Sequence, residues 1–167
     1  MSKMIEGLDI PRVDVDPVTL QVLGGSFKMI AQEMGMVLYR MSYSSIIRES
    51  EDIGAGIVDT VGRQLCESES TPMHVGSIGG NVKGILTRWD KKDIHEGDIF
   101  IHNHPYYGTS HSPDIHICLP IFYKGELISF SCVQAHLLDN GSHTPGMDVF
   151  ARDIYAETRI YYEIGRA

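Results

Sequence analysis

Histidines are concentrated in one part of the chain. Six of the eight lie between residues 102 and 143, far more than an even scatter along 167 residues would place there. They are His102, His104, His111, His116, His136 and His143. Imidazole changes protonation near neutral pH, and its neutral form is a common metal ligand. The concentration therefore indicates metal binding or acid–base chemistry.

The strongest candidate metal site combines His111, Asp114 and His136. The first two form an H-x-x-D pattern, and His136 follows in Gln-Ala-His-Leu-Leu-Asp. Imidazole nitrogen and carboxylate oxygen together suit Mn, Zn or Fe. Three protein ligands would leave positions open, so the ion could polarise a carbonyl or activate water. The alternative is that each histidine is solvated or satisfies a local hydrogen bond, because H-x-x-D alone is a weak motif.

A predicted β-hairpin over residues 115–134 decides whether these ligands meet. A two-residue turn at 124–125 would place His136 on the opposite face of the hairpin from Asp114. A three-residue loop with a glycine bulge would place both on one face. A bulge at Pro120 would also bring them together. The sequence permits both registers.

The other elements follow from periodicity and turn signals. Asp16-Pro17 predicts the start of a helix over 17–41, whose methionine-rich stripe we expect in the core. We also expect a hairpin over 54–68, a glycine-rich helix over 74–89, a strand over 98–102 and a last helix over 149–164. The predicted fold class is α+β, an antiparallel sheet with a central hairpin packed by helices. Residues 1–16 form an N-terminal arm, and 17–167 form one domain.

Composition narrows the function classes. Fourteen basic and 22 acidic residues give a net charge of −8, which argues against a nucleic-acid partner. The apolar runs are too short to cross a membrane, and no secretory signal is visible at the N-terminus. The three cysteines form no CxxC pair, so we expect reduced, buried thiols. We therefore expect a soluble, cytoplasmic protein.

Several segments together resemble the N-terminal part of hydantoinase B/oxoprolinase proteins. They are DPVTLQVLGGSFKMIAQEMGMVLYRMSYSSIIRESEDIGAGIVD, STPMHVGSIGGNV, NHPYYGTSHSPDIHICLPIFYKGELISF and AHLLDNG. This family includes catalytic subunits of N-methylhydantoinase and 5-oxoprolinase and large subunits of acetone and acetophenone carboxylases. The resemblance runs from about Asp16 to the C-terminus and covers roughly the first third of a family member. Many relatives carry Asp where this chain has His104.

The resemblance implies an ATP-dependent reaction shared between subunits. A hydantoinase A-type partner would bind ATP and Mg and phosphorylate a carbonyl or amide oxygen of a small molecule. The B-type subunit would complete hydrolysis or carboxylation. This chain would be one part of that subunit, and the remainder of the subunit would be a partner. The absence of a GxxxxGK[ST] motif agrees with ATP binding elsewhere. The resemblance maps a metal, Mn first and Zn or Fe as alternatives, onto His111, Asp114 and His136.

Three further histidines are candidate catalytic residues. His104, together with His102, could transfer protons. His116 could act on substrate, or it could orient a ligand imidazole, as could Asp139. His74 could line a substrate pocket or cap the helix that follows it. The alternative reading of the whole chain is a non-catalytic assembly subunit of such a complex.

Overall fold

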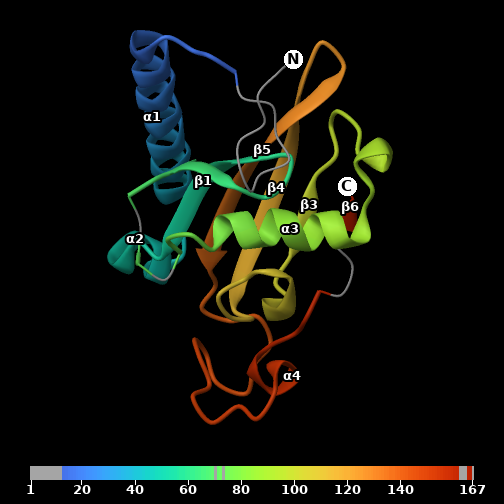
Figure 1. The fold of residues 1–167 in the computed structure, drawn as a ribbon. Coiled ribbons are helices and arrows are strands. Elements are labelled where there is room, and N and C mark those ends of the chain that lie inside the picture. The colour runs from blue at the N-terminus through green and yellow to red at the C-terminus, as the bar shows by residue number, and fades with distance from the viewer. Residues whose placement is uncertain (1–12, 70, 73, 162–164, 167) are drawn as a thin grey trace.

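A computed structural model describes residues 13–69, 71–72, 74–161 and 165–166. Its elements are α1 (Pro17–Met41), α2 (Ser45–Ser50), β1 (Ile53–Asp59), β2 (Gln64–Glu67), α3 (Ile78–Arg88), η1 (Lys91–Asp93), β3 (Phe100–His102), η2 (Pro105–Tyr107), β4 (Asp114–Tyr123), β5 (Glu126–His136), α4 (Ile154–Glu157) and β6 (Gly165–Arg166). The strands form one antiparallel sheet in the order β2-β1-β5-β4-β3-β6, with the β4–β5 hairpin at its centre (Figure 1). The predicted α+β class is confirmed. Most of the predicted arm lies outside the described residues.

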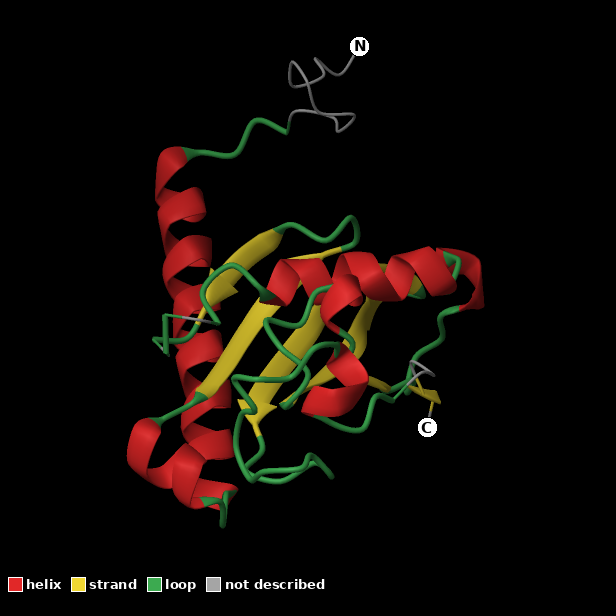
Figure 2. Ribbon diagram, turned by 90° about the horizontal axis from the view of Figure 1, so that it is seen from below, coloured by secondary structure: helices red, strands yellow, loops and turns green. Residues whose placement is uncertain are grey.

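Helices α1 and α3 lie on opposite faces of this sheet (Figure 2). Gly56 of β1 lies close to Ile78 of α3, whereas the neighbouring Ala55 lies close to Gly35 of α1. Successive residues of a strand point to opposite faces, so α3 and α1 cover different sides. Figure 1 shows α1 beside β1, at the end of the sheet away from β3.

The face under α3 changes from apolar to polar along the strands. Its apolar part forms the core, with Phe100, Cys118, Phe130 and Cys132 packed against Val82 and other residues of α3. Its polar part is also buried and consists of His102, Asp114, His116, Gln134 and His136. Burying polar groups costs free energy unless they are hydrogen-bonded or hold a ligand. So many buried polar side chains on one face indicate a functional site in this part of the sheet.

The hairpin combines a two-residue turn with a bulge. Tyr123 pairs with Glu126 across the turn, as in the first predicted register. The register then shifts because Ile121 pairs with Ser129 and Phe122 with Leu127, which leaves Ile128 as an extra residue on β5. The bulge lies one residue from the position predicted at Pro120. Beyond the bulge, each β5 side chain lies on the opposite face from the one that a uniform ladder would give. His136 therefore lies on the same face as Asp114.

The predicted role of the methionine-rich stripe in the core is wrong. Helix α1 begins as expected, with Asp16 Oδ1 accepting a hydrogen bond from the Thr19 N–H at 2.9 Å. However, its buried residues are Ala31 and Gly35. These small residues let the helix backbone approach Ser68, the residue that follows β2, and most of the larger apolar side chains of α1 are left exposed.

The predicted last helix is also wrong over most of its length. Of its described residues, 149–161, only Ile154–Glu157 are helical, and Thr158 is extended. Asn103 fixes this segment in an extended form, because its Nδ2 donates to the Arg159 carbonyl and its Oδ1 accepts from the Tyr161 N–H, both at 2.8 Å. Within the part of the chain that is described, no helix is long and apolar enough to cross a membrane.

Candidate metal centre

Asp114 and His136 pair directly across β4 and β5, and His111 reaches the same point from the preceding loop. The Asp114 Oδ1 atom lies 2.8 Å from His111 Nε2 and 3.1 Å from His136 Nδ1. The two ring nitrogens are 3.0 Å apart. One ligand atom from each of the three residues lies within 4.8 Å of the others. The structure thus brings together all three predicted ligands.

The donor chemistry of this cluster fits a cation. Two imidazole nitrogens and one carboxylate oxygen converge, and only a single proton fits between two facing ring nitrogens. A divalent ion would accept a lone pair from all three atoms at once. All three groups are shielded, since Asp114 and His136 are buried and His111 is half-buried. The residues present therefore fit a divalent metal.

The charges within the cluster oppose the effect of burial. Burial alone would raise the pKa of Asp114, but hydrogen bonds from His111, His136 and Ser110 lower it well below its usual range. Burial would lower the pKa of His111, but Asp114, Glu157 and Asp52 raise it above its usual value. Asp114 is therefore an anion, as a metal ligand must be. Because the pKa of His111 is raised, protons compete with a metal for its ring nitrogen.

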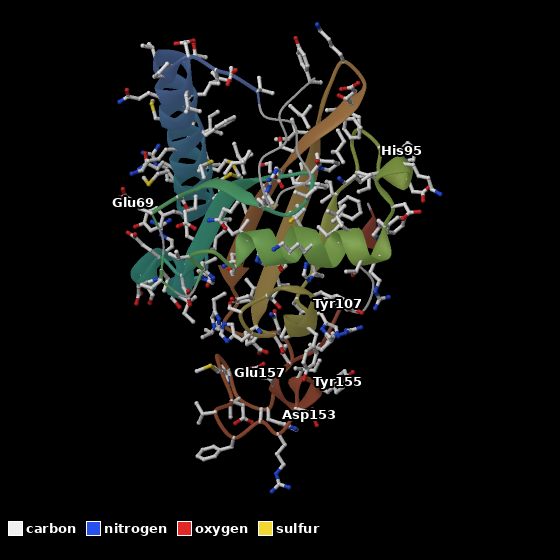
Figure 3. The ribbon with its side chains drawn as sticks, viewed as in Figure 1. Glu69, His95, Tyr107, Asp153, Tyr155 and Glu157 are labelled. Atoms are coloured by element: carbon white, nitrogen blue, oxygen red, sulfur yellow. The ribbon has the colours of Figure 1, made fainter. Side chains whose placement is uncertain are left out.

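Close backbone packing against α3 positions the loop that carries His111. The carbonyl of Tyr107 lies over Gly84, and a Cβ at that position would collide with it. Gly108 has a φ of +115° and lies equally close to the backbone of Gly80. Asn81 Nδ2 donates to the Gly108 carbonyl at 3.2 Å. Figure 3 shows Tyr107 directly below α3.

His74 lies between two carboxylates, one of which the sequence analysis missed. Its Nε2 lies 2.8 Å from Asp52 Oδ1, and its Nδ1 lies 3.6 Å from Asp114 Oδ2. The ring is fully buried, in a turn just before α3 rather than inside the helix. Asp52 comes near because β1 pairs with β5, so that the His136 N–H donates to the Asp52 carbonyl at 3.1 Å. No local motif marks Asp52; only the pairing of β1 with β5 could have found it.

His116 lies two residues from Asp114 on the same face, beneath α3. Its Nε2 contacts Gln134 Oε1 and lies 2.7 Å from Asn81 Nδ2. Burial, with a smaller effect of His102, lowers its pKa well below the usual value. His116 is thus a neutral ring in a hydrogen-bonded network that connects α3 to both central strands.

His102 and His104 have other surroundings. His102 stacks on His116 with ring centroids 5.8 Å apart, and burial lowers its pKa to about 4. His104 caps η2, where its Nδ1 accepts from the Tyr106 N–H at 3.3 Å and its ring packs on Tyr107. Burial and the nearby Arg88 lower its pKa. His104 thus caps η2, and His102 is a buried, neutral ring that stacks on His116.

The C-terminal segment contacts the loop that carries His111. Glu157 of α4 accepts a hydrogen bond from the Ser112 N–H at 3.3 Å, next to His111. Figure 3 shows Glu157 on the side of α4 that faces the sheet. Asp139, in contrast, is exposed and accepts from the Gly141 N–H in its own loop. Glu157, which the sequence alone does not indicate, therefore lies beside the cluster and is one of the groups that raise the pKa of His111.

These observations define a class of protein: an α+β fold whose central hairpin carries a buried His/Asp cluster able to hold a divalent cation. The sequence profile of the Hydantoinase B/oxoprolinase family matches residues 16–164. The chain belongs to this family.

Individual relatives agree with that assignment. The chain is 53% identical over 148 residues to the B-type subunit of a putative D-/L-hydantoinase from Pseudomonas sp. (strain NS671), a match that covers 86% of this chain and 25% of that protein. It is 34% identical over 143 residues to 5-oxoprolinase 1 of Arabidopsis thaliana, covering 85% of this chain and 11% of that protein.

Solved structures show the same fold. An ATP-dependent caprolactamase from Pseudomonas jessenii matches with a TM-score of 0.77 and 32% identity, over 88% of this chain and 25% of that one. Nucleotide-free acetone carboxylase matches with a TM-score of 0.71 and 26% identity, over 78% and 17%. The chain spans a quarter or less of the length of these relatives.

Proposed function

We propose that this chain is the metal-bearing part of a B-type subunit in an ATP-dependent complex. The complex would be a cyclic-amide hydrolase of the hydantoinase type or a ketone carboxylase. One observation carries the proposal: His111 and His136 converge on the buried Asp114 carboxylate. The names of the relatives support the reaction class, since they include a hydantoinase subunit, a 5-oxoprolinase, a caprolactamase and an acetone carboxylase.

In this proposal His111, Asp114 and His136 hold a divalent ion, with Mn the first candidate and Zn or Fe the alternatives. When bound, such an ion supplies Lewis acidity for a carbonyl oxygen or lowers the pKa of water. Asp52 orients His74, whose Nδ1 lies 3.6 Å from Asp114 Oδ2, the carboxylate oxygen that does not contact His111 or His136. Ser110 holds the same oxygen from the other side.

The remaining parts of the reaction belong to partners. An A-type subunit would bind ATP and Mg and phosphorylate the carbonyl or amide oxygen of a small-molecule substrate. The rest of the B-type polypeptide would complete the substrate site, because relatives carry at least three times as much chain outside the matched part. In this proposal His104 and His116 are positioning residues. His104 caps η2, and His116 connects β4 to α3 through its contact with Asn81.

Metal analysis of the purified chain tests the proposal. We expect stoichiometric Mn or Zn in the parent protein and in His143→Ala, which changes an exposed histidine of the 139–148 loop. His111→Ala should lose the metal and keep the circular dichroism spectrum of the parent, because the sheet core does not involve His111. Parent-level occupancy in His111→Ala would rule out the site. An unfolded variant would indicate a structural metal.

A non-catalytic assembly subunit is the second candidate, and it is favoured by the contacts of His104 and His116, which cap η2 and connect β4 to α3. Metal content separates the two proposals, since an assembly subunit needs none. ATP hydrolysis by the reconstituted complex, measured with hydantoins, oxoproline and ketones and with or without bicarbonate, would then identify the reaction.

A further inference from the structure

A groove lies between α1 and the face of the sheet that points away from the candidate metal centre. Its volume is about 500 Å³. We call it the outer groove; its lining consists of Ile30, Glu33, Met34, Val37, Leu38, Met41, Ser131 and Val133. The lining is mostly apolar, with Glu33 as its one charged residue. The second half of the α1 stripe that the sequence places in the core, from Ile30 to Met41, thus lines this groove instead.

The apolar surface continues from the groove across the hairpin. The side chains of β4 that point away from α3 are Ile115, Ile117, Leu119 and Ile121, and each of them is half-buried or exposed. Helix α1 contacts mainly β1 and β2, at one end of the sheet (Figures 1 and 2). The described part of the chain therefore leaves the outer face of β4 without a covering layer.

Large apolar side chains of this surface are exposed to solvent. Val37 is 49% exposed, Leu119 41% and Met41 72%. Monomeric proteins seldom expose a contiguous apolar patch larger than a few hundred Å² without a partner. A helix with apolar residues around its circumference is normally buried on all sides. Covering such side chains would stabilise the assembled protein, because it removes their apolar surface from water.

We propose that the outer groove and the adjoining face of β4 form the surface against which the remaining part of a B-type subunit packs. The chain matches only 25% of the length of the Pseudomonas sp. hydantoinase subunit and of the caprolactamase, so three quarters of each relative lies outside the matched part and is available to cover this surface. The opposite face is already closed by α3. The packing segment would present apolar side chains, with a cation opposite Glu33. This inference rests on family membership and is independent of any metal.

Thiol labelling tests the proposal in two proteins. One is the chain itself, and the other is a chimera in which it replaces the matched quarter of the Pseudomonas sp. hydantoinase subunit. Val37→Cys, in a Cys66→Ser background that removes the half-buried native thiol, reports on the groove. Lys92→Cys, at the exposed η1 on the other side of the sheet, is the control. The probe is a maleimide.

We expect Val37→Cys to react readily in the isolated chain and roughly tenfold more slowly in the chimera, because packed thiols react only through local opening. Lys92→Cys should react alike in both, and the buried Cys118 and Cys132 should stay unreactive in both, which shows that the chimera is folded. Met41→Cys repeats the measurement at the other end of the groove. Equal labelling of the groove cysteines in both proteins would overturn the proposal.

A second copy of the chain is the competing occupant. In that case the groove cysteines would already be protected in the isolated chain, more so at higher concentration, and light scattering would give a dimer. That result also overturns the proposal. Repeating the labelling in His111→Ala separates this test from the metal site, because the groove should behave identically there.

Discussion

Asp114 and His136 are direct cross-strand partners only because β5 contains one residue more than β4 between them and the turn. With a uniform ladder from the Tyr123–Glu126 pair, the partner of Asp114 would be Ala135, and His136 would point to the outer face. The extra residue at Ile128 moves His136 to the α3 face, within 3.1 Å of the carboxylate. A single bulge therefore creates the candidate site.

Asp114→Asn should remove metal binding and also change the protonation of His111. The carboxylate is the main group that raises the His111 pKa, whereas burial lowers it. With a neutral amide in its place, the pKa of His111 should fall, because burial still lowers it and only the weaker effects of Glu157 and Asp52 still raise it. An NMR titration of the metal-free protein measures this. Glu126→Gln, at the exposed hairpin turn, is the matched control and should leave it unchanged.

Metal affinity should fall as the pH is lowered. Because the His111 pKa is raised, protons compete with the metal at a higher pH than at an ordinary histidine. Below that pKa the apparent affinity should decrease by about tenfold per pH unit for one displaced proton. Competition titrations with a chromophoric chelator between pH 8 and pH 5.5 check this. A flat profile would show that His111 is not a ligand.

Stability should decline on acidification between the usual histidine pKa and about pH 4. The pKa of buried His102 falls from 6.5 to about 4, so the folded state holds its neutral form. Above 6.5 the ring is neutral in both states; below it the unfolded chain takes up a proton that the folded chain does not. This single group lowers the free energy of unfolding by about 3 kcal/mol at pH 4.

His102→Gln should flatten this pH dependence, as measured by urea unfolding at several pH values. His143→Gln, at an exposed histidine, should keep the slope of the parent. If His102→Gln and the parent lose stability in parallel, another group, such as His116, carries the effect.

Gly84→Ala should weaken both folding and metal binding. The new methyl group would meet the backbone of Tyr107, which cannot move without displacing the loop that leads to His111. We expect a loss of about 1–3 kcal/mol in unfolding free energy, as for other overpacked sites, together with weaker metal binding. Gly25→Ala is the matched control: it meets open space in exposed α1 and should stabilise the protein by about 1 kcal/mol. Equal effects of the two changes would contradict the packing argument.

The sequence by itself determines the local features of this protein. The cap at Asp16 with Pro17 sets the start of α1, and the alternation over 115–134 predicts the central hairpin. Residue types at His111, Asp114 and His136 indicate the metal donor set, because ligand chemistry follows from side-chain type. The family resemblance, quoted from whole segments, is confirmed by the matched profile.

The tertiary structure decides what depends on distant segments. The bulge at Ile128 selects the face of His136, and nothing in the local sequence distinguishes it from a slip of one residue. Asp52 reaches His74 only through the pairing of β1 with β5. Asn103 holds residues 159–161 extended against their helical periodicity. In each case a contact between segments far apart along the chain outweighs a local preference of about 1 kcal/mol per residue or less.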